Sequence, residues 1–559
     1  MADTVKAKKA KSAPKAAPAQ AKDRVADVAA KTDVKTDAAV KQAKSVETQP
    51  EVKAEKIAAE NKEAPVKSAP VKAEKAKEVK SEGKKRKKIL LVASEALPYV
   101  KTGGLADVAA SLPKALNAAG YDCRVIMPLY FDISDDFKHT MRYLGNVYVP
   151  LAWRNQYCGV FTQTYDGVTY YFIDNEFYFK RRGLYGHYDD GERFAFFSKA
   201  VLESMSVTDF YPDIIHANDW HTALTPVYLD VFYRGIPALS HVKTVFTIHN
   251  IQFQGQYGDG IIGDVLGLPS DRASLVMYKG CANYMKGAIE CSNVVTTVSP
   301  TYACEILDPY YGYEMEDILR SRSYKLHGIV NGIDEKRNDP ATDKALFVNY
   351  DLEHYSKKAE NKVNLQRMLG LPENPDVAMI GMVGRLTEQK GLDLVAGVLE
   401  NIMQMPVQLV VLGQGDWRYE DMFKRTQNEH NAKFRCVLGF SSDLASKIYG
   451  ASDMFLMPSK FEPCGLSQLI AMRYGSVPIV RETGGLKDTV KAYDCTTGEG
   501  NGLTFYSYNA YDMLDAIRRA VGLYYDYKQD WSKVVTSGMR GDYSWSSTAK
   551  SYADLYESL

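Results

Sequence analysis

Short apolar segments alternate with helical patterns through most of this chain, and this alternation constrains the fold more than any other feature. Each segment is four to six residues long, and the gaps between most of them can hold a helix. Buried strands separated by helices indicate parallel sheets covered by helices. The predicted strands span residues 89–93, 124–128, 213–216, 244–249, 294–298, 379–383, 408–412, 434–438, 454–457 and 477–480.

One segment of the first half departs from this alternation. Residues 157–165 and 168–174 flank the pair Asp166-Gly167, which is typical of a two-residue turn in a β-hairpin. In the second half, helical patterns cover residues 391–403, 441–451, 465–474 and 510–522.

One such sheet rarely needs the roughly 470 residues that follow position 88, so the sequence predicts an α/β fold with two Rossmann-like domains. These domains span residues 89–327 and 328–541 and are expected to face each other across a cleft, while residues 542–559 pack back on the first domain. Ligands of open parallel sheets bind beyond the carboxyl ends of the strands. Residues that carry chemistry are therefore expected directly after strands.

Residues 1–88 differ in composition from the rest of the chain. They contain 24 Lys and Arg against 13 Asp and Glu and no aromatic residue, which gives this tail a charge of +11 and the remainder −11. Such a segment buries too little apolar area to offset the entropy of ordering, so we predict a disordered tail. A basic tail is able to contact an anionic partner, although a solvated spacer is the simpler interpretation.

Targeting and cysteine patterns favour a cytoplasmic protein. The tail lacks the apolar stretch of a signal peptide, and no apolar run is long enough to span a membrane. The eight cysteines include no C-x-x-C pair. In a chain of this size, that pattern indicates reduced thiols and argues against a structural zinc site.

The first motif that carries chemistry is Lys101-Thr102-Gly103-Gly104. It follows the strand at 89–93 and precedes a helical pattern that begins at Leu105. Paired glycines let backbone N–H groups approach a ligand, and a helix start and a lysine add positive charge. The motif suits a sugar nucleotide or its diphosphate. Taken alone, it also fits a plain strand–helix connection.

Further motifs follow strands as this fold predicts. Arg385 and Lys390 bracket a turn at a helix start and form a natural clamp for a diphosphate. Glu462 is a carboxylate beside a helix N-terminus, where a simple capping role is the alternative. Thr483, Gly484 and Gly485 form a second glycine-rich cradle, and His221 lies in a tight turn after the strand at 213–216.

Together these segments resemble the bacterial and plant glycogen and starch synthases, which are retaining glucosyltransferases of the two-domain GT-B fold. The resemblance runs from residue 89 to the C-terminus. It is carried by residues 101–108, 216–221, 247–250, 330–334, 384–391, 460–466 and 483–486. Each motif is weak alone, but their order and spacing are very specific.

The resemblance implies that glucose passes from a nucleotide sugar to the non-reducing end of an α-1,4-glucan. Arg385 and Lys390 would then neutralise the leaving diphosphate, and Glu462 would hold the glucose hydroxyls. His221 would line the sugar pocket, and Asp189 matches an acceptor-side aspartate. The resemblance also assigns donor binding to Lys101, Gly103, Gly104, Asn331, Phe440, Cys464, Gly465, Leu466, Thr483, Gly484 and Gly485.

Fixed cations are expected to replace a metal ion in this reaction, and no cofactor is expected. Many metal-dependent glycosyltransferases anchor the ion with Asp-x-Asp, which this chain lacks. Related families place a second glutamate eight residues after the first, but in this chain that position is Ile470. Glu462 therefore has no obvious carboxylate partner for a double-displacement mechanism. ADP-glucose is the expected donor, with UDP-glucose as the alternative.

Other functions fit less well. Gly413-Gln414-Gly415 is followed by Arg418 where a dehydrogenase needs a third glycine, and no Walker A motif occurs. A phosphorylase would need a pyridoxal-phosphate lysine context that is not recognisable. A sucrose or trehalose-phosphate synthase is the enzymatic runner-up, and a catalytically silent glucan-binding protein is the alternative from another functional class.

Overall fold

The computed structural model describes residues 86–559. The predicted tail, residues 1–88, therefore lies outside the described residues except for its last three positions. Lys88 begins the first strand. Lys87 donates from its Nζ to the backbone carbonyl of Tyr556 at 2.8 Å. The structural description of the chain thus starts at the first sheet.

The first sheet has nine strands in the order β12-β11-β7-β6-β1-β2-β5-β4-β3. The strands from β12 to β5 are parallel, and β4 and β3 continue the sheet in antiparallel pairing. Their bounds are β1 (Lys88–Val92), β2 (Asp122–Pro128), β3 (Arg142–Leu151), β4 (Arg154–Tyr165), β5 (Val168–Asp174), β6 (Ile214–Asn218), β7 (Lys243–Ile248), β11 (Val294–Thr297) and β12 (Leu326–Gly328).

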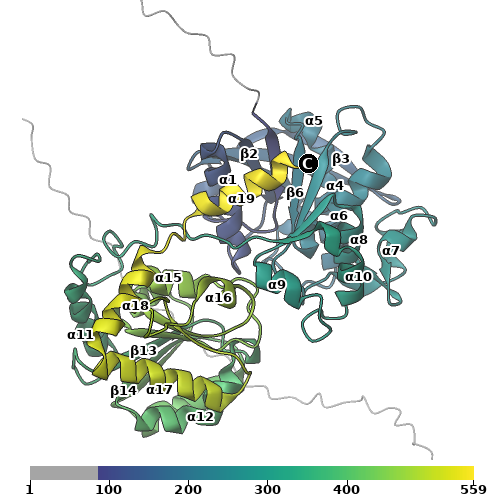
Figure 1. The fold of residues 1–559 in the computed structure, drawn as a ribbon. Coiled ribbons are helices and arrows are strands. Elements are labelled where there is room, and N and C mark those ends of the chain that lie inside the picture. Colours follow the sequence, from purple (N-terminus) through teal and green to yellow (C-terminus); the bar gives the residue numbers. More distant parts are fainter. Residues whose placement is uncertain (1–85) are drawn as a thin grey trace, which may run out of the picture. The chain divides into compact units, whose positions relative to one another are not determined.

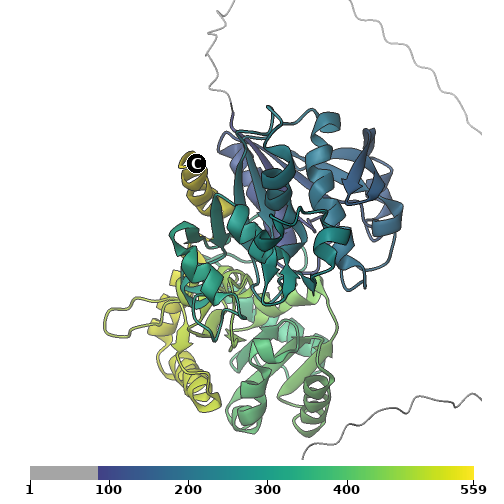
Figure 2. The same ribbon diagram turned by 90° about the vertical axis from the view of Figure 1, so that its right-hand side faces the viewer.

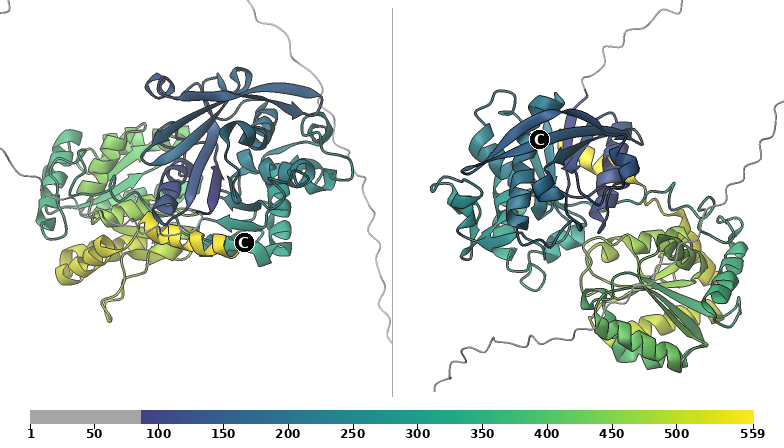
Figure 3. Two further views of the ribbon diagram at one scale, coloured as in Figure 1. Left: turned by 90° about the horizontal axis from the view of Figure 1, so that it is seen from above. Right: turned by 180° about the vertical axis from the view of Figure 1, so that it is seen from behind.

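The predicted hairpin is confirmed as β4 and β5. Tyr165 pairs with Val168, and both residues of the turn between them, Asp166 and Gly167, have positive φ angles of 47° and 78°. Strand β3 was not predicted from the sequence, because most of its side chains are exposed or half-buried and no continuous apolar run marks it. Figure 3 shows these long strands at one edge of the sheet.

Helices pack on both faces of the first sheet, and a small sheet of β8 (Gln256–Gly258), β10 (Cys281–Asn283) and β9 (Met277–Tyr278) lies in the same lobe. The helices are α1 (Leu105–Ala118), α2 (Asp135–Lys138), α3 (Glu176–Phe179), α4 (Asp190–Glu203), α5 (Met205–Thr208), α6 (Leu224–Tyr228), α7 (Ile261–Asp264), α8 (Tyr284–Cys291), α9 (Pro300–Glu305) and α10 (Glu316–Ser321).

The second sheet is entirely parallel, with the order β15-β14-β13-β16-β17-β18. Five of its strands were predicted to within one residue at each end. They and the sixth are β13 (Ala378–Val383), β14 (Val407–Gly413), β15 (Phe434–Leu438), β16 (Met454–Met457), β17 (Val477–Arg481) and β18 (Leu503–Phe505).

Figure 1 shows α12 and α17 on one face of this second sheet and α15 and α16 on the other. Two parallel sheets covered by helices confirm the predicted α/β class with two Rossmann-like units. The helices that follow the first lobe are α11 (Lys358–Leu369), α12 (Leu392–Gln404), α13 (Trp417–Glu429), α14 (Ser442–Ala451), α15 (Ser467–Arg473), α16 (Gly484–Thr489), α17 (Ala510–Asp526), α18 (Lys528–Arg540) and α19 (Trp545–Glu557).

The last helix, α19, belongs to the core of the first lobe, and Figures 1 and 2 show it alongside that lobe. Trp545, Tyr552 and Tyr556 are buried in the same apolar cluster as β1 and α1. The Tyr556 hydroxyl also forms a 2.8 Å hydrogen bond with Nδ1 of His216, a fully buried residue of β6. The end of the chain therefore supports the helix that carries the first glycine-rich loop.

Candidate active site

An ion pair joins two of the predicted site residues in the second lobe. Lys390 Nζ donates to Glu462 Oε2 at 2.6 Å, and the Ser459 hydroxyl donates to the same oxygen at 3.0 Å. Lys390 follows β13 and Glu462 follows β16, which are neighbouring parallel strands. Their loops meet because the carboxyl ends of parallel strands share one edge of the sheet.

Backbone packing requires glycine where these loops meet. Gly391 has a φ of 73°, and a Cβ there would lie 2.0 Å from the carbonyl oxygen of Pro458. Glu462 itself lies five residues before α15, which begins at Ser467, so the structure does not place it as a capping residue of that helix. Its side chain is 8% exposed, so its carboxylate depends on Lys390 and Ser459 for compensation.

Arg385 differs from its predicted partner Lys390. Its side chain is exposed and makes no hydrogen bond or ion pair within residues 86–559. The clamp thus contains one paired lysine and one arginine that is available to an anion.

The second glycine-rich segment, Thr483 to Gly485, follows β17 and packs on the Glu462 loop. A Cβ on Gly484 would lie 2.0 Å from the carbonyl oxygen of Glu462, and Gly485 donates its N–H to that oxygen at 3.1 Å. The loops after β13, β16 and β17 therefore form one continuous edge. Cys464 and Gly465 lie within it; Cys464 is buried, and Gly465 has a φ of 74°.

A carboxylate of the first lobe already occupies this segment. Glu305, at the end of α9, accepts hydrogen bonds from the Thr483 hydroxyl at 2.9 Å and from the Gly484 N–H at 3.0 Å. Burial raises the pKa of Glu305, while the bonds from Gly484 and Thr483 oppose that rise. The cradle predicted from the sequence thus binds an anion that belongs to the protein.

The first glycine-rich loop holds a second internal carboxylate. Glu95 accepts from the N–H and the hydroxyl of Thr102, both at 2.6 Å, and from the N–H of Gly103 at 3.1 Å. Lys101 pairs with Asp107 in the first turn of α1 at 2.7 Å. A Cβ on Gly104 would lie 3.8 Å from Cδ1 of Leu466, so the loop approaches the predicted binding motif of the second lobe.

His221 lies in a cage of rings directly after β6. The centroids of Trp220, Tyr185 and Phe194 are 4.1, 4.3 and 4.6 Å from that of its imidazole, and the residue is 8% exposed. Burial, with a smaller contribution from Arg193, lowers its pKa to about 3. His221 is therefore a neutral group at physiological pH and cannot serve as a cation there.

Asp219, two residues before His221, shapes this turn. Its φ is 57°, and its carboxylate accepts from the N–H of His249 at 2.8 Å. Burial raises its pKa to about 7, and the bonds from the His249 and Asn250 N–H groups oppose that rise. A non-glycine residue with positive φ is uncommon and costs free energy, so tertiary contacts hold this turn in place.

Asp189 carries an ion pair that the sequence did not reveal. Arg181 donates to its two oxygens at 2.6 and 2.8 Å. Burial raises the pKa of Asp189, but the hydrogen bonds and charge of Arg181 outweigh it, and the pKa is lowered overall. Asp189 is thus an ionised carboxylate with a fixed direction.

The remaining predicted residues are Asn331 and Phe440. The backbone N–H of Asn331 faces the sulfur of Cys464, two residues after Glu462. Asn331 is 6% exposed, and its Oδ1 is buried without a hydrogen-bond partner among residues 86–559. Phe440 is 84% exposed in the loop after β15, the edge strand of the second sheet. Its ring is free to stack on a flat ligand.

The two internal glutamates, Glu95 and Glu305, were not predicted as site residues. Glu95 directly follows the predicted strand at 89–93, whereas Glu305 lies at the far end of the helix that follows the predicted strand at 294–298. The position of Glu95 is where the fold places polar site residues. Which backbone groups they bind depends on the tertiary structure.

Two protein families match this chain in succession. The starch synthase catalytic domain matches residues 88–321, and the group 1 glycosyl transferases match residues 368–533. The glycogen synthase of Clostridium acetobutylicum is 53% identical over 476 residues, covering 84% of this chain and 100% of the relative. The chain belongs to the glycogen synthase family. The glycogen synthase of Clostridium novyi is 52% identical, and the match covers 84% of this chain and 99% of that relative.

Solved structures agree with this family. The catalytic domain of starch synthase IV from Arabidopsis thaliana, bound to ADP and acarbose, is 34% identical with a TM-score of 0.78. The match covers 85% of this chain and 99% of that one. Sucrose-phosphate synthase from Thermosynechococcus elongatus is 18% identical with a TM-score of 0.54, which shows a shared fold alone.

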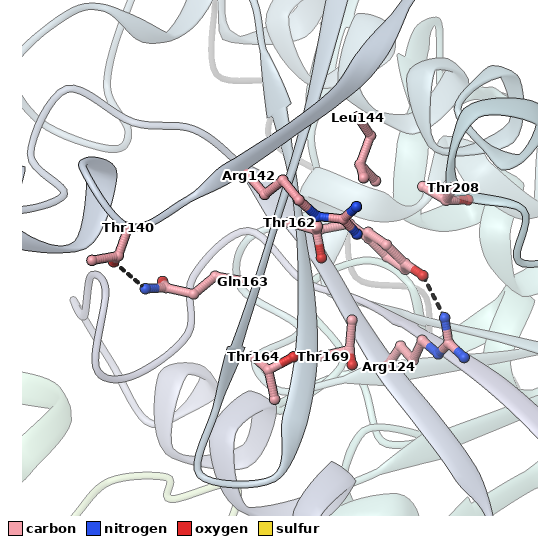
Figure 4. Close-up of a pocket in the computed structure, with 10 residues that line it drawn as sticks. Arg124, Thr140, Arg142, Leu144, Thr162, Gln163, Thr164, Thr169 and Thr208 are labelled. Carbon is pink, nitrogen blue, oxygen red and sulfur yellow. Dashed lines mark hydrogen bonds between the residues drawn. The ribbon is translucent and has the colours of Figure 1, made fainter.

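The remaining features of this glycogen synthase family member concern membrane-spanning helices, metal-binding clusters and hollows. No helix within residues 86–559 is long and apolar enough to cross a membrane, and no cluster of three or more His, Cys, Asp or Glu there could hold a metal ion. A polar hollow of about 580 Å³ lies over the antiparallel part of the first sheet. Figure 4 shows the side chains that line it. None of the predicted site residues lines this hollow. Its lining residues are Arg124, Thr140, Arg142, Leu144, Thr162, Gln163, Thr164, Thr169, Tyr171 and Thr208.

Proposed function

We propose that this protein transfers glucose from ADP-glucose to the non-reducing end of an α-1,4-glucan with retention of configuration. Membership of the glycogen synthase family supports glucosyl transfer to a glucan. The observation that carries the site assignment is the meeting of Lys390 and Glu462, with Arg385 exposed five residues before Lys390 and unpaired within residues 86–559. These three groups provide cations for a diphosphate and a carboxylate for sugar hydroxyls.

In the proposed reaction, the bond between the anomeric carbon and the diphosphate oxygen breaks as the acceptor hydroxyl attacks the same face. The acceptor proton passes to the departing oxygen. Arg385 and Lys390 stabilise the negative charge that develops there, which is the largest charge change in the transition state. Lys101 and the start of α1 add to this field from the first lobe.

The remaining groups orient the sugar. Glu462 is released from Lys390 when the diphosphate takes the ammonium, and its oxygens then accept from glucose hydroxyls. His221, held neutral by its burial, lines the pocket near the anomeric carbon without adding a positive charge that would disfavour an oxocarbenium-like state. Asp189, ionised beside Arg181, lies on the acceptor side, and Phe440 offers a ring to the donor base.

We also propose that the reaction needs no metal ion and takes place in the cytoplasm. The cation set supports the first point, because Lys101, Arg385 and Lys390 supply the charge that a divalent ion would otherwise provide. All eight cysteines are free, which supports a reducing compartment. Activity that survives dialysis against EDTA would support the metal-free reaction, and restoration by added Mg²⁺ or Mn²⁺ after a loss would refute it.

The donor assignment rests on the family and on a neighbour described as bound to ADP. The decisive assay offers ADP-glucose and UDP-glucose separately, with glycogen as acceptor, and measures the nucleoside diphosphate that is released. We expect release from ADP-glucose that depends on glycogen. Faster release from UDP-glucose would change the donor, and no release from either would indicate a catalytically silent glucan-binding protein.

A further inference from the structure

Glu95 is a buried carboxylate directly after β1 that the proposed reaction does not use. It is 2% exposed, so a bound donor cannot reach it. It accepts hydrogen bonds from the N–H and hydroxyl of Thr102 and from the N–H of Gly103, and the backbone N–H of Ala106 in the first turn of α1 also faces it. This residue therefore acts on the loop from behind.

These bonds decide which backbone groups of the loop remain available. The N–H groups of Thr102 and Gly103 are occupied by Glu95. The N–H groups of Gly104 and Leu105, at the start of α1, have no hydrogen-bond partner within residues 86–559, as expected for the first N–H groups of a helix. Among residues 86–559, an anion that approaches this loop therefore finds free backbone N–H groups at its second glycine and at the residue after it.

The two glycines also face different surroundings. A Cβ on Gly103 would lie 3.6 Å from Oε1 of Glu95, in ordinary contact. A Cβ on Gly104 would have Cδ1 of Leu466, in the second lobe, as its neighbour at 3.8 Å. Gly103 thus faces the interior of the first lobe, and Gly104 faces the motif that holds Glu462 and Cys464.

We propose that Glu95 is a positioning residue for the nucleotide-sugar donor. It fixes the loop so that the N–H groups of Gly104 and Leu105, together with Lys101, meet the donor diphosphate, and it withholds the N–H groups of Thr102 and Gly103. Its negative charge behind the loop offsets the partial positive charge of those two groups and directs the anion towards α1. This inference rests on the proposed function of the loop.

The test measures ADP binding by calorimetry and initial rates with donor and glycogen varied separately. Glu95→Gln places an amide NH₂ or a weaker acceptor against the loop donors, so we expect the Kd for ADP and the donor KM to rise at least about tenfold. The KM for glycogen should stay within about twofold, because a defect confined to donor positioning does not alter the acceptor site. An unchanged Kd for ADP, or an equal rise in the glycogen KM, would overturn the proposal.

Matched variants at Thr102 keep the test decisive even if Glu95→Gln does not fold. Thr102→Val removes one hydrogen-bond donor to Glu95, and Thr102→Ser keeps it. We expect the Kd for ADP to rise about threefold to tenfold in the valine variant and to return to the wild-type value in the serine variant. Equal affinities for the two variants would contradict the proposal.

The wild-type enzyme separates this inference from the proposed function. If the wild type releases no ADP from ADP-glucose and binds no ADP, the proposed donor itself is wrong. If the wild type is active and Glu95→Gln matches it in both the ADP Kd and the donor KM, only the role of Glu95 is wrong. Lys533→Ala, which removes an exposed ion pair with Asp530 within α18, should bind ADP within about twofold of the wild type.

Discussion

The two glycine-rich segments of this molecule each hold a glutamate carboxylate, but the carboxylates come from different places. Glu95 belongs to the same lobe as the Thr102–Gly103 loop and follows the strand on which that loop is built. Glu305 comes from α9 of the first lobe and binds Thr483 and Gly484 of the second. The first carboxylate is a fixed part of its loop, whereas the second can leave if the lobes move.

This difference separates two kinds of anion site. In the first lobe, the occupied N–H groups are permanently satisfied, and ligand binding uses the groups that remain. In the second lobe, the hydroxyl of Thr483 and the N–H of Gly484 become available only when Glu305 withdraws. We expect donor binding to compete with an internal carboxylate at the second segment and not at the first.

The largest expected effect concerns the cation beside the second segment. Lys390→Ala should lower turnover by a factor of about 10² to 10³, because the diphosphate leaving group loses a fixed positive charge that stabilises it. The fold should persist, since the Lys390 side chain is 25% exposed at the surface of its loop. Steady-state release of ADP in the presence of glycogen measures this change.

Lys533→Ala is the matched control for this variant. Lys533 forms an ion pair with Asp530 within α18 and is 56% exposed, so its removal should leave turnover unchanged. Near-normal turnover of Lys390→Ala would remove the lysine from the proposed clamp.

A smaller effect should distinguish the exchangeable carboxylate from the fixed one. Glu305→Gln removes the charge that occupies Thr483 and Gly484, so ADP should bind about threefold to tenfold more tightly. Glu95→Gln should shift the affinity in the opposite direction. Calorimetry with ADP alone, without glycogen, compares the two variants directly.

Thr301→Ala serves as the control for Glu305→Gln. Thr301 donates from its N–H and hydroxyl to Asp488, so α9 contacts α16 here without involving Gly484. If Thr301→Ala tightens ADP binding as much as Glu305→Gln does, the effect comes from loosening the contact between lobes and not from vacating the cradle.

The pH dependence of ADP binding offers a finer test. Burial raises the pKa of Glu305, so this carboxyl protonates at a higher pH than an exposed glutamate. The wild type should therefore approach Glu305→Gln in ADP affinity as the pH falls from about 8 to about 5. Taking the ratio of the two Kd values cancels the titration of the nucleotide itself. A ratio that stays constant across this range would indicate that the Glu305 charge does not compete.

The smallest expected effect concerns the support of the fixed segment. Tyr556→Phe removes the hydrogen bond to His216, so the free energy of unfolding should fall by about 1 kcal/mol. The ADP affinity should stay within about twofold, because the aromatic packing of α19 against the first lobe is retained. Denaturant melts report the first quantity and calorimetry the second. A large loss of ADP affinity would show that the fixed loop depends on this single bond.

Much of this molecule could be read from local patterns. Five strands of the second sheet were predicted almost residue by residue, because buried parallel strands are continuous apolar runs. The same reasoning missed β3, whose side chains are mostly exposed or half-buried and leave no apolar signature. The sequence placed Lys390 and Glu462 after strands, but their contact depends on β13 and β16 being neighbours, which the structure revealed.

Local sequence patterns specify the α/β class, the hairpin at Asp166-Gly167 and the loops in which charged and glycine residues gather. Which of those loop groups already hold a hydrogen-bond partner depends on the folded structure. Glu305 and Thr483 are 178 positions apart in the chain. Glu95 and Thr102 are close in sequence, but the hydrophobic pattern does not specify the backbone path of the turn between them. Periodicity reports which face of an element is buried, whereas hydrogen-bond partners depend on how distant elements meet, and that is fixed only when the chain has folded.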